Sequence, residues 1–382
     1  MGAHALLSPS SASRWLNCTA APHLEADMPD VSSDFAVEGT LAHAYCAKKL
    51  KTFLGLPTDL EDKEIAELAE YHTGEMDEYT DAYATIVIEK YNAARAITPD
   101  AQLLVETRLD FSEHIPDSFG TADAIIIADG TMDVIDFKYG KGVKVSAFEN
   151  PQMMIYALGA YDKFSFEYRI ERVRMTIVQP RIDNLSDFEL SVAALMEWTD
   201  TILTPKAQEA FSGNGTQQPG EWCRFCKVKC RCRALTEQSL NTALAKPDPR
   251  LLTPEELARD VLPNLETIKT WLSGVEEFAL HTALSGTTVP GWKVVEGRST
   301  RKITNPSAVS DALTGAGIER DLIYKPQELL SITELEKLCG KKQFAALCAQ
   351  WISKPQGKPT LVPESDKRQA INTVEDDFAD IH

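Results

Sequence analysis

The sequence predicts an α/β fold in which helices flank a central sheet, and two kinds of periodicity carry this prediction. Apolar and polar residues alternate over short runs, which is typical of strands with one buried face. Apolar residues recur every three or four positions over longer runs, which is typical of amphipathic helices. The strand-like runs cover residues 103–111, 121–128, 131–137 and 172–178, and the main helical runs cover 37–53, 59–97 and the stretch after residue 150.

Three helical segments are expected before the sheet. The first begins near Pro9, because proline suits the first turn of a helix. The second spans residues 37–53 and carries His43. The third, residues 58–98, is an acidic insertion that we expect to form one or two exposed amphipathic helices.

The elements from the sheet onward are marked by turn and cap residues. Asp129-Gly130 is a strong two-residue hairpin signal between two strands. Asn150-Pro151 supplies an N-cap followed by proline at the first helical position. Residues 185–211 are expected to be helical, and residues 245–382 are expected to form a mostly helical C-terminal region whose role the pattern does not reveal.

Composition limits the classes of function. The 382 residues carry a net charge of −18, which argues against a protein that coats nucleic acid nonspecifically. The charge is uneven: residues 61–91 hold ten acids and two bases, whereas residues 223–233 hold five bases and no acid. No apolar run approaches the roughly 18 residues of a membrane span. We therefore expect a cytoplasmic protein that has no membrane contact and can still bind DNA on one face.

The most informative motif is Asp136-Phe137-Lys138, at the end of a predicted strand. Side chains alternate along a strand, so Asp136 and Lys138 point to the same face. Asp123 lies on the preceding strand and can be brought alongside. Two carboxylates suit a divalent cation such as Mg²⁺ or Mn²⁺, and a lysine beside them can orient water. This combination suits hydrolysis of a phosphodiester.

Four of the eight cysteines fall within ten residues, and this density indicates metal ligation rather than disulfides. Four thiolates complete either a tetrahedral zinc site or an iron–sulfur cluster. The site could use all four local cysteines, or three of them with the distant Cys18. The local cysteines are Cys223, Cys226, Cys230 and Cys232; Cys46, Cys339 and Cys348 lie on apolar helical faces and are expected to be core thiols.

Taken in order, these motifs resemble the RecB-like branch of the PD-(D/E)XK nucleases, especially its members with an iron–sulfur cluster. The resemblance covers about residues 8–235, and the whole chain also resembles an uncharacterised phage and prophage family built on this core. Each motif is weak alone, but their order and spacing are specific. The matching elements are Ser10 through Trp15 to Cys18, Glu38-Gly39-Thr40 with His43, Gly120-Thr121-Ala122-Asp123, Asp136-Phe137-Lys138, Gln152-Met153-Met154-Ile155-Tyr156, and the three late cysteines.

The resemblance implies a restriction-endonuclease-like core over residues 1–235, with a central mixed sheet flanked by helices. It also implies a four-iron cluster on Cys18, Cys223, Cys226 and Cys232, with structural zinc as the alternative because Cys230 is an extra thiol. In such a nuclease, His43, Asp123, Asp136 and the carbonyl of Phe137 would ligate the cation, and Lys138 would position the attacking water.

Five further residues receive roles in this hypothesis. Glu106 would hold a second cation or support the first, or else be a solvated strand residue. Gln152 and Tyr156 would contact the DNA backbone or order the metal shell. Family members more often have glutamate where this chain has Asp136, which is shorter by one methylene and can still ligate a hard cation. Lys141 and Lys144 would hold the scissile strand, or else belong to a solvated loop.

The leading hypothesis is therefore a metal-dependent DNA nuclease, an exonuclease or end-resecting enzyme in phage replication or recombination. Its expected partners are DNA and proteins such as a single-strand-binding or annealing protein. The alternative is a catalytically weak or inactive nucleic-acid-binding module on a nuclease scaffold. A zinc-stabilised interaction protein would leave Asp123, Asp136 and Lys138 unexplained. The sequence does not distinguish exonuclease from endonuclease action, strand polarity or oligomeric state.

Overall fold

The computed structural model describes residues 5–28, 34–243, 253–292 and 294, which belong to one compact unit, Met1–Val295. The second unit, Glu296–His382, lies outside the described residues, and so does most of the predicted C-terminal region. Cys339 and Cys348 belong to this part of the chain.

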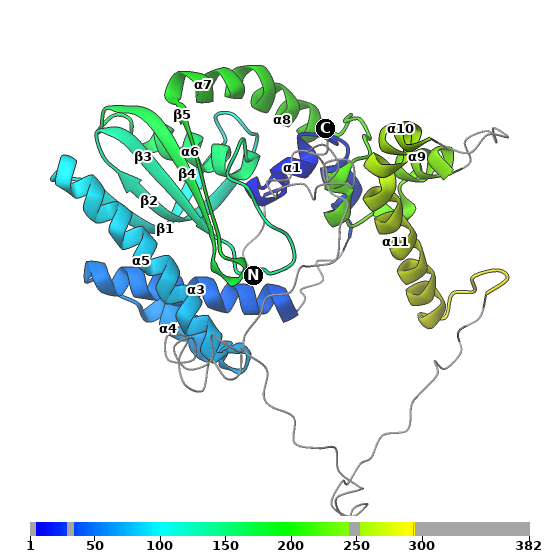
Figure 1. Ribbon diagram of the computed structural model, residues 1–382, viewed down its shortest axis with the longest axis horizontal. Coiled ribbons are helices and arrows are strands. Elements are labelled where there is room, and N and C mark those ends of the chain that lie inside the picture. The colour runs from blue at the N-terminus through cyan, green and yellow to red at the C-terminus, as the bar shows by residue number, and fades with distance from the viewer. Residues whose placement is uncertain (1–4, 29–33, 244–252, 293, 295–382) are drawn as a thin grey trace, which may run out of the picture. The chain divides into compact units, whose positions relative to one another are not determined.

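A five-stranded mixed sheet forms the centre of the fold, with the strands in chain order (Figure 1). Adjacent strands run antiparallel except β3 and β4, which are parallel. The predicted α/β fold with a mixed sheet flanked by helices is thus confirmed, and so are the four predicted strands. The strands are β1 (Gln102–Asp110), β2 (Phe119–Ile127), β3 (Gly130–Phe137), β4 (Ile170–Gln179) and β5 (Asn184–Ser191).

The predicted connections of the sheet are also confirmed. Gly130 has φ of 84°, a left-handed conformation that the tight turn between β2 and β3 requires. α6 (Pro151–Phe164) makes the crossover that two parallel strands need. It begins where Asn150 Oδ1 accepts a hydrogen bond from Met153 N at 3.3 Å.

Three helices before the sheet cover one of its faces: α3 (Asp34–Leu54), α4 (Asp59–Glu67) and α5 (Gly74–Ile97). The acidic insertion is helical as predicted, and its apolar stripe packs against α3 and the sheet. Tyr83 of α5 and Phe137 of β3 are both fully buried, with ring centroids 5.0 Å apart. Burial of such large rings holds the helical layer on the strands. Cys46 lies in this core, as expected of a structural thiol.

The opposite face is covered by α6 and by α7 (Val192–Trp198) and α8 (Thr204–Phe211) (Figure 1). The N-terminal segment joins this core through Trp15, which is 1% exposed and donates from Nε1 to the carbonyl oxygen of Ser8 at 3.0 Å. The predicted N-terminal helix is short and consists of η1 (Pro9–Ser11), α1 (Ala12–Trp15) and α2 (Ala21–Glu25).

The prediction of one helix over residues 185–211 was wrong at its start. Residues 184–191 form the edge strand β5, where Phe188 and Leu190 alternate with more exposed residues. This short run matches period two as well as a helical stripe, and pairing with β4 decides in favour of the strand. The helical part begins at Val192, continues through a π-helical turn (Thr199–Leu203) and ends at Phe211.

The described elements after residue 211 are helical. None of the described helices combines the length and apolar character that a bilayer crossing needs. The elements after residue 211 are η5 (Glu221–Phe225), η6 (Lys229–Arg231), α9 (Arg233–Ala243), α10 (Pro254–Glu256), η7 (Leu257–Val261), η8 (Leu262–Asn264) and α11 (Leu265–Leu284). Two short 3₁₀ helices occur earlier in the chain, η2 (Ala69–Tyr71) and η3 (Pro180–Ile182).

Candidate active site and cysteine pocket

The candidate active site lies where β2 and β3 stop pairing. The last ladder pair before it joins Ala124 to Ile135. Beyond that pair, a side chain replaces the ladder: Asp123 Oδ2 accepts a hydrogen bond from Phe137 N at 2.7 Å. The carboxylate of Asp123 is therefore fixed at the opening between the two strands.

His43, Glu106 and Asp123 form a compact group of possible metal ligands. One imidazole nitrogen and one oxygen from each carboxylate all lie within 4.8 Å of one another. His43 comes from α3, and its Nδ1 atom is 3.3 Å from Asp123 Oδ1. Its ring also packs edge-on against Phe137, with centroids 5.3 Å apart. One helix and two strands thus converge on a site with two oxygen donors and one nitrogen donor, a set that suits a hard divalent cation.

Glu106 reaches this group through an unusual backbone conformation. Its φ is 49°, in the left-handed region that a glutamate rarely adopts. The neighbouring pairs Val105–Ala124 and Thr107–Ala122 keep the register of β1 and β2 on either side of it. Such a conformation costs about 1–3 kcal/mol and persists only where the surrounding structure holds it.

Asp136, Lys138 and Gln152 form a second group beside the first. Lys138 Nζ lies 3.0 Å from Asp136 Oδ2 and donates to Gln152 Oε1 at 3.1 Å. Gln152, on the first turn of α6, donates from Nε2 to Asp136 Oδ1 at 3.3 Å. Asp136 Oδ2 is buried and, although close to the lysine, accepts no well-directed hydrogen bond. This oxygen therefore has lone pairs available for another ligand.

Electrostatics at the first group favour a positive charge. Burial opposes the charged form of His43, but the carboxylates of Asp123, Asp136 and Glu106 raise its pKa to about 9. Burial and the charge of Asp123 raise the pKa of Glu106 to about 8. Without a cation the site therefore keeps protons that the same side chains would lose in water near pH 7.

Burial and neighbouring charges also shift the pKa values of Asp136 and Lys138 in the second group. Burial raises the pKa of Asp136, with a further contribution from Asp123. Burial alone would lower the pKa of Lys138, but Asp136 and Asp123 outweigh it and raise that pKa above its usual range. Lys138 is therefore a cation in this environment, which suits charge stabilisation better than proton abstraction.

Two predicted residues, Tyr156 and Phe137, have rings that belong to the hydrophobic core beside these groups. Tyr156 is 8% exposed and packs against Phe111 with ring centroids 6.0 Å apart. Burial and the nearby carboxylates raise the pKa of its hydroxyl. The side chain of Phe137 belongs to the core, and only its backbone faces Asp123. Both residues therefore support the site from the core side.

A groove of about 870 Å³ leads away from Lys138 and Gln152. One wall is the segment after Lys138, where Val143 and Val145 line the groove. The other walls come from the N-terminal segment, the cysteine-rich segment and α11. Their lining residues include Ser10, Ser13, Trp222, Arg224, Phe225 and Thr270.

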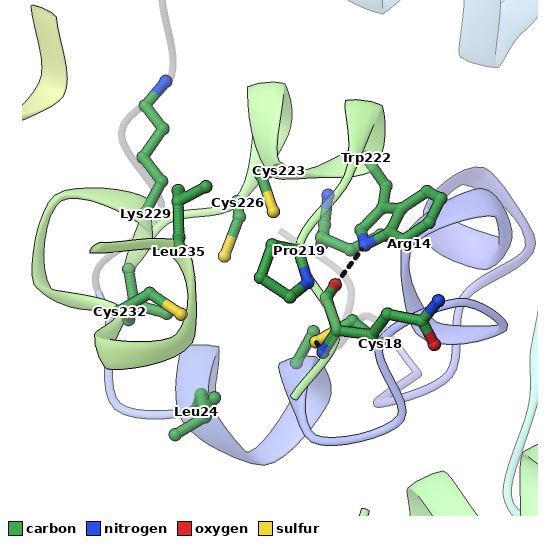
Figure 2. A pocket seen from close by; sticks show the side chains of 13 residues that line it. Arg14, Cys18, Leu24, Pro219, Trp222, Cys223, Cys226, Lys229, Cys232 and Leu235 are labelled. Atoms are coloured by element: carbon green, nitrogen blue, oxygen red, sulfur yellow. Dashed lines mark hydrogen bonds between the residues drawn. The ribbon is translucent and has the colours of Figure 1, made fainter. Parts of the chain in front are cut away.

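The four cysteines of the predicted cluster line one narrow pocket, and Figure 2 shows their side chains around a common space. Cys18 comes from the N-terminal segment, whereas Cys223, Cys226 and Cys232 come from the turns after residue 220. Cys230 does not line this pocket; its Cβ lies close to Gly274 of α11. Among the described residues, the groups of three possible ligand atoms within 4.8 Å include no cysteine.

Backbone groups and a buried ion pair hold this pocket together. Gln218 N donates to Cys18 Sγ at 3.5 Å, and Gly220 N donates to Cys223 Sγ at 3.4 Å. Glu25, 8% exposed, accepts from Arg14 Nε at 2.9 Å and from the backbone N of Lys227 at 2.6 Å. Burial and Glu25 raise the pKa of Cys226 to about 12.

Residues 4–369 match the family model described as "Protein of unknown function (DUF2800)". The chain belongs to the DUF2800 family. This match covers nearly the whole sequence and confirms the predicted membership of an uncharacterised family. A family of unknown function supplies no activity, so the function of this DUF2800 protein has to be inferred from its site.

Two solved structures resemble the DUF2800 protein at low scores. One, described as "Crystal structure of SSO0001", is 14% identical, with a TM-score of 0.24, over 58% of this chain and 96% of that chain. The other, described as a "Putative exonuclease" from Eubacterium rectale, is 11% identical, with a TM-score of 0.34, over 67% of this chain and 93% of that chain.

Two features of the DUF2800 protein have no clear signal in its sequence. One is the contact of Arg14 and Glu25 with the cysteine-rich segment: Arg14 Nη1 donates to the carbonyl oxygen of Phe225 at 3.2 Å, and Glu25 accepts from the backbone N of Lys227 at 2.6 Å. The other is a second group of possible ligand atoms, from Glu113, His114 and Asp162, which no sequence motif predicts. His114 Nε2 lies 3.2 Å from Asp162 Oδ2, which makes it an ordinary partly buried ion pair.

Proposed function

We propose that this DUF2800 protein is a metal-dependent deoxyribonuclease that hydrolyses phosphodiester bonds. The main support is that possible ligand atoms of His43, Glu106 and Asp123 lie within 4.8 Å of one another. This group lies beside the group formed by Asp136, Lys138 and Gln152. Three strands, one helix and the start of α6 contribute to this arrangement. Three carboxylates in one partly buried place repel one another and lose hydration, which lowers the stability of the fold. A purely structural role therefore does not explain why they are gathered here.

The donor set supports a divalent cation such as Mg²⁺ or Mn²⁺. His43, Glu106 and Asp123 would hold it, and the free lone pair of Asp136 Oδ2 makes that carboxylate a further candidate. The carbonyl of Phe137 stays a prediction that no observation tests. When bound, the cation would lower the pKa of water and offset negative charge on the phosphate.

Lys138 and Gln152 would act on the bound phosphate rather than hold the cation. The lysine carries a positive charge because Asp136 and Asp123 raise its pKa, so it can stabilise charge that develops on the phosphate. Gln152 accepts from Lys138 and donates to Asp136, and it would hold both in place. Tyr156 would support Gln152 from the core, one turn further along α6.

A binding module that only borrowed this scaffold is the competing function. Such a module would bind DNA through the groove and would not require the acids to be paired with a charged lysine. The intact Asp136–Lys138 contact of 3.0 Å therefore supports catalysis. The choice between exonuclease and endonuclease action, and a role in phage replication or recombination with a single-strand-binding or annealing protein, stay predictions, as does a location in the cytoplasm.

Cleavage of labelled DNA by the full chain tests this proposal. We expect Mn²⁺ or Mg²⁺ to be required, and we expect Asp136→Ala and Lys138→Ala each to lower the rate by at least about a hundredfold. Glu113→Ala is the matched control, because it removes an acid from the other ligand group and should leave the rate unchanged. DNA binding without cleavage in either metal, or full activity of either site variant, would refute the nuclease.

We further propose that Cys18, Cys223, Cys226 and Cys232 hold a four-iron cluster rather than zinc. The four thiols share one pocket, and two backbone N–H groups donate to their sulfur atoms, as is common around metal-bound thiolates. Zn–S bonds of about 2.3 Å would bring four sulfurs to about 3.8 Å from one another.

Metal analysis of anaerobically purified protein separates the two metals. We expect about four irons and four inorganic sulfides per chain and a brown colour. One zinc per chain without iron would show that the structural metal is zinc. The cluster would fasten the N-terminal segment to the cysteine-rich segment, a role that needs no redox chemistry.

A further inference from the structure

Two buried amide side chains at the β4–β5 turn bind the segment that follows Lys138. Gln179 is the last residue of β4 and 2% exposed, and Asn184 is the first residue of β5 and 5% exposed. An amide that is buried this deeply must satisfy its donors and acceptor within the protein. Here nearly all of its partners are backbone atoms of a single loop.

The contacts use the full hydrogen-bonding capacity of Gln179. Nε2 donates to the carbonyl oxygens of Gly140 at 2.7 Å and Val143 at 2.8 Å. Oε1 accepts from the backbone N of Val145 and from Asn184 Nδ2, both at 3.2 Å. Asn184 Nδ2 also donates to the carbonyl oxygen of Val145 at 2.8 Å. Residues 140–145 are thus held at both ends by the same pair of amides.

The same strand end also fixes the proposed catalytic lysine. The backbone N of Lys138 donates to the carbonyl oxygen of Val178 at 2.9 Å, one residue before Gln179. The position of the loop relative to the Lys138 side chain is therefore set by two consecutive residues of β4. Val143 and Val145 then line the groove together with Lys138 and Gln152.

The loop carries two exposed lysines. Lys141 and Lys144 are both exposed, and within the described part of the chain neither forms an ion pair. The chain as a whole has a net charge of −18, so two exposed lysines on a segment whose Val143 and Val145 line the groove are informative. Exposed lysines next to a hydrolytic site are suited to the phosphates of a polyanion.

We propose that Gln179, assisted by Asn184, is a positioning residue that holds residues 140–145 as the phosphate-binding wall of the groove. The inference rests on the proposed nuclease function and adds to it the element that grips the substrate. Lys141 and Lys144 contact the nucleic-acid backbone, and Gln179 acts through them without touching the substrate.

The test compares Gln179→Leu with the double variant Lys141→Ala/Lys144→Ala and with their combination. DNA affinity is measured in EDTA, and KM and kcat are measured in Mn²⁺. We expect each variant to weaken DNA binding and raise KM by about tenfold, with kcat within about twofold of the wild type. Because Gln179 acts through the lysines, the combined variant should bind no more weakly than the double variant.

Hydrogen exchange supplies a readout that does not depend on activity. The amide of Val145 should lose protection in Gln179→Leu and keep it in Gln102→Leu, a control at the start of β1 whose side chain contacts Tyr168 instead. Gln179→Glu, which places a carboxyl oxygen against the carbonyl oxygens of Gly140 and Val143, should also lose protection at Val145, and the Tm of each variant shows whether it folds.

Three results would overturn the inference. The first is normal DNA affinity in Gln179→Leu despite lost protection at Val145, the second is additive weakening in the combined variant, and the third is unchanged protection at Val145 in Gln179→Leu. If the wild-type protein neither binds nor cleaves DNA, the proposed nuclease function fails instead, and unchanged protection at Val145 would independently refute the positioning by Gln179.

Discussion

Nδ1 of His43 lies 3.3 Å from Oδ1 of Asp123, and this contact joins the helical layer to the sheet at the candidate metal site. The His43–Asp123 pair can exist in a protonated state or in a metal-bound state. With a proton on the imidazole it is an ion pair, and with a cation between the side chains both would be ligands. Because the carboxylates raise the pKa of His43 to about 9, protons compete with metal across the neutral range.

Metal affinity should therefore depend on pH. A cation must displace the protons from His43 and Glu106, so the affinity for Mn²⁺ should rise by up to about a hundredfold per pH unit below pH 8 and by about tenfold per pH unit between pH 8 and pH 9. Isothermal titration of the full chain at several pH values measures this slope. His43→Gln should bind Mn²⁺ more weakly at high pH and show a shallower slope; a slope equal to that of the wild type would exclude His43 as a ligand.

The stability of the metal-free protein should fall as pH rises. Glu106 keeps its proton up to about pH 8 in the folded state but loses it near pH 4.5 when unfolded, so its contribution declines between these values. The contribution of His43 is complete below pH 6.5 and is lost as pH rises through about 9. Melting curves in EDTA should show a falling Tm from pH 6 to pH 9, and Mn²⁺ should reduce the fall. A Tm independent of pH would contradict these shifts.

Glu106 should stabilise metal binding at a cost to the fold. Its left-handed φ of 49° is free of strain for glycine, so Glu106→Gly should raise the Tm of the metal-free protein while weakening Mn²⁺ binding by at least about tenfold. Glu106→Gln keeps the strain and removes the charge, which separates the two effects. A lower Tm for the glycine variant would show that the conformation is not strained.

Substitution of Cys230 and of Cys232 should have different effects on bound metal, although the two residues are only two positions apart. Cys232 lines the pocket with Cys18, Cys223 and Cys226, whereas Cys230 does not. Cys232→Ala should therefore lose most of the bound metal, and Cys230→Ala should keep it. Metal content per chain after anaerobic purification measures both. Loss of metal in the Cys230 variant with retention in the Cys232 variant would point to a different ligand set.

Two helical glycines should respond in opposite directions to alanine. A Cβ at Gly159 of α6 would lie 2.6 Å from Cδ1 of Phe111, so Gly159→Ala should destabilise the protein by about 1–3 kcal/mol. A Cβ at Gly39 of α3 would meet nothing within 4 Å, so Gly39→Ala should stabilise it by about 0.5–1 kcal/mol. Urea denaturation of both variants checks the signs, and equal shifts would contradict the packing of α6 under Phe111.

Local features of the chain could be predicted because their signals are local. Alternation of side chains located β1 to β4, Gly130 marked the hairpin, and Asn150 with Pro151 marked the start of α6. The edge strand β5 was mistaken for helix because eight residues carry too few periods to separate the two patterns, and only pairing with β4 decided between them.

The sequence by itself determined which chemical groups this protein has and the order in which they occur: Asp123, Asp136, Lys138 and a dense set of cysteines around an α/β core. The tertiary structure decided which of them meet. It placed Glu106, rather than Asp136, in the compact group with His43 and Asp123, and it directed Cys18, not Cys230, toward the shared pocket. The physical reason is that periodicity specifies the face on which a side chain lies, whereas contacts between distant segments depend on how whole layers pack and where strands separate.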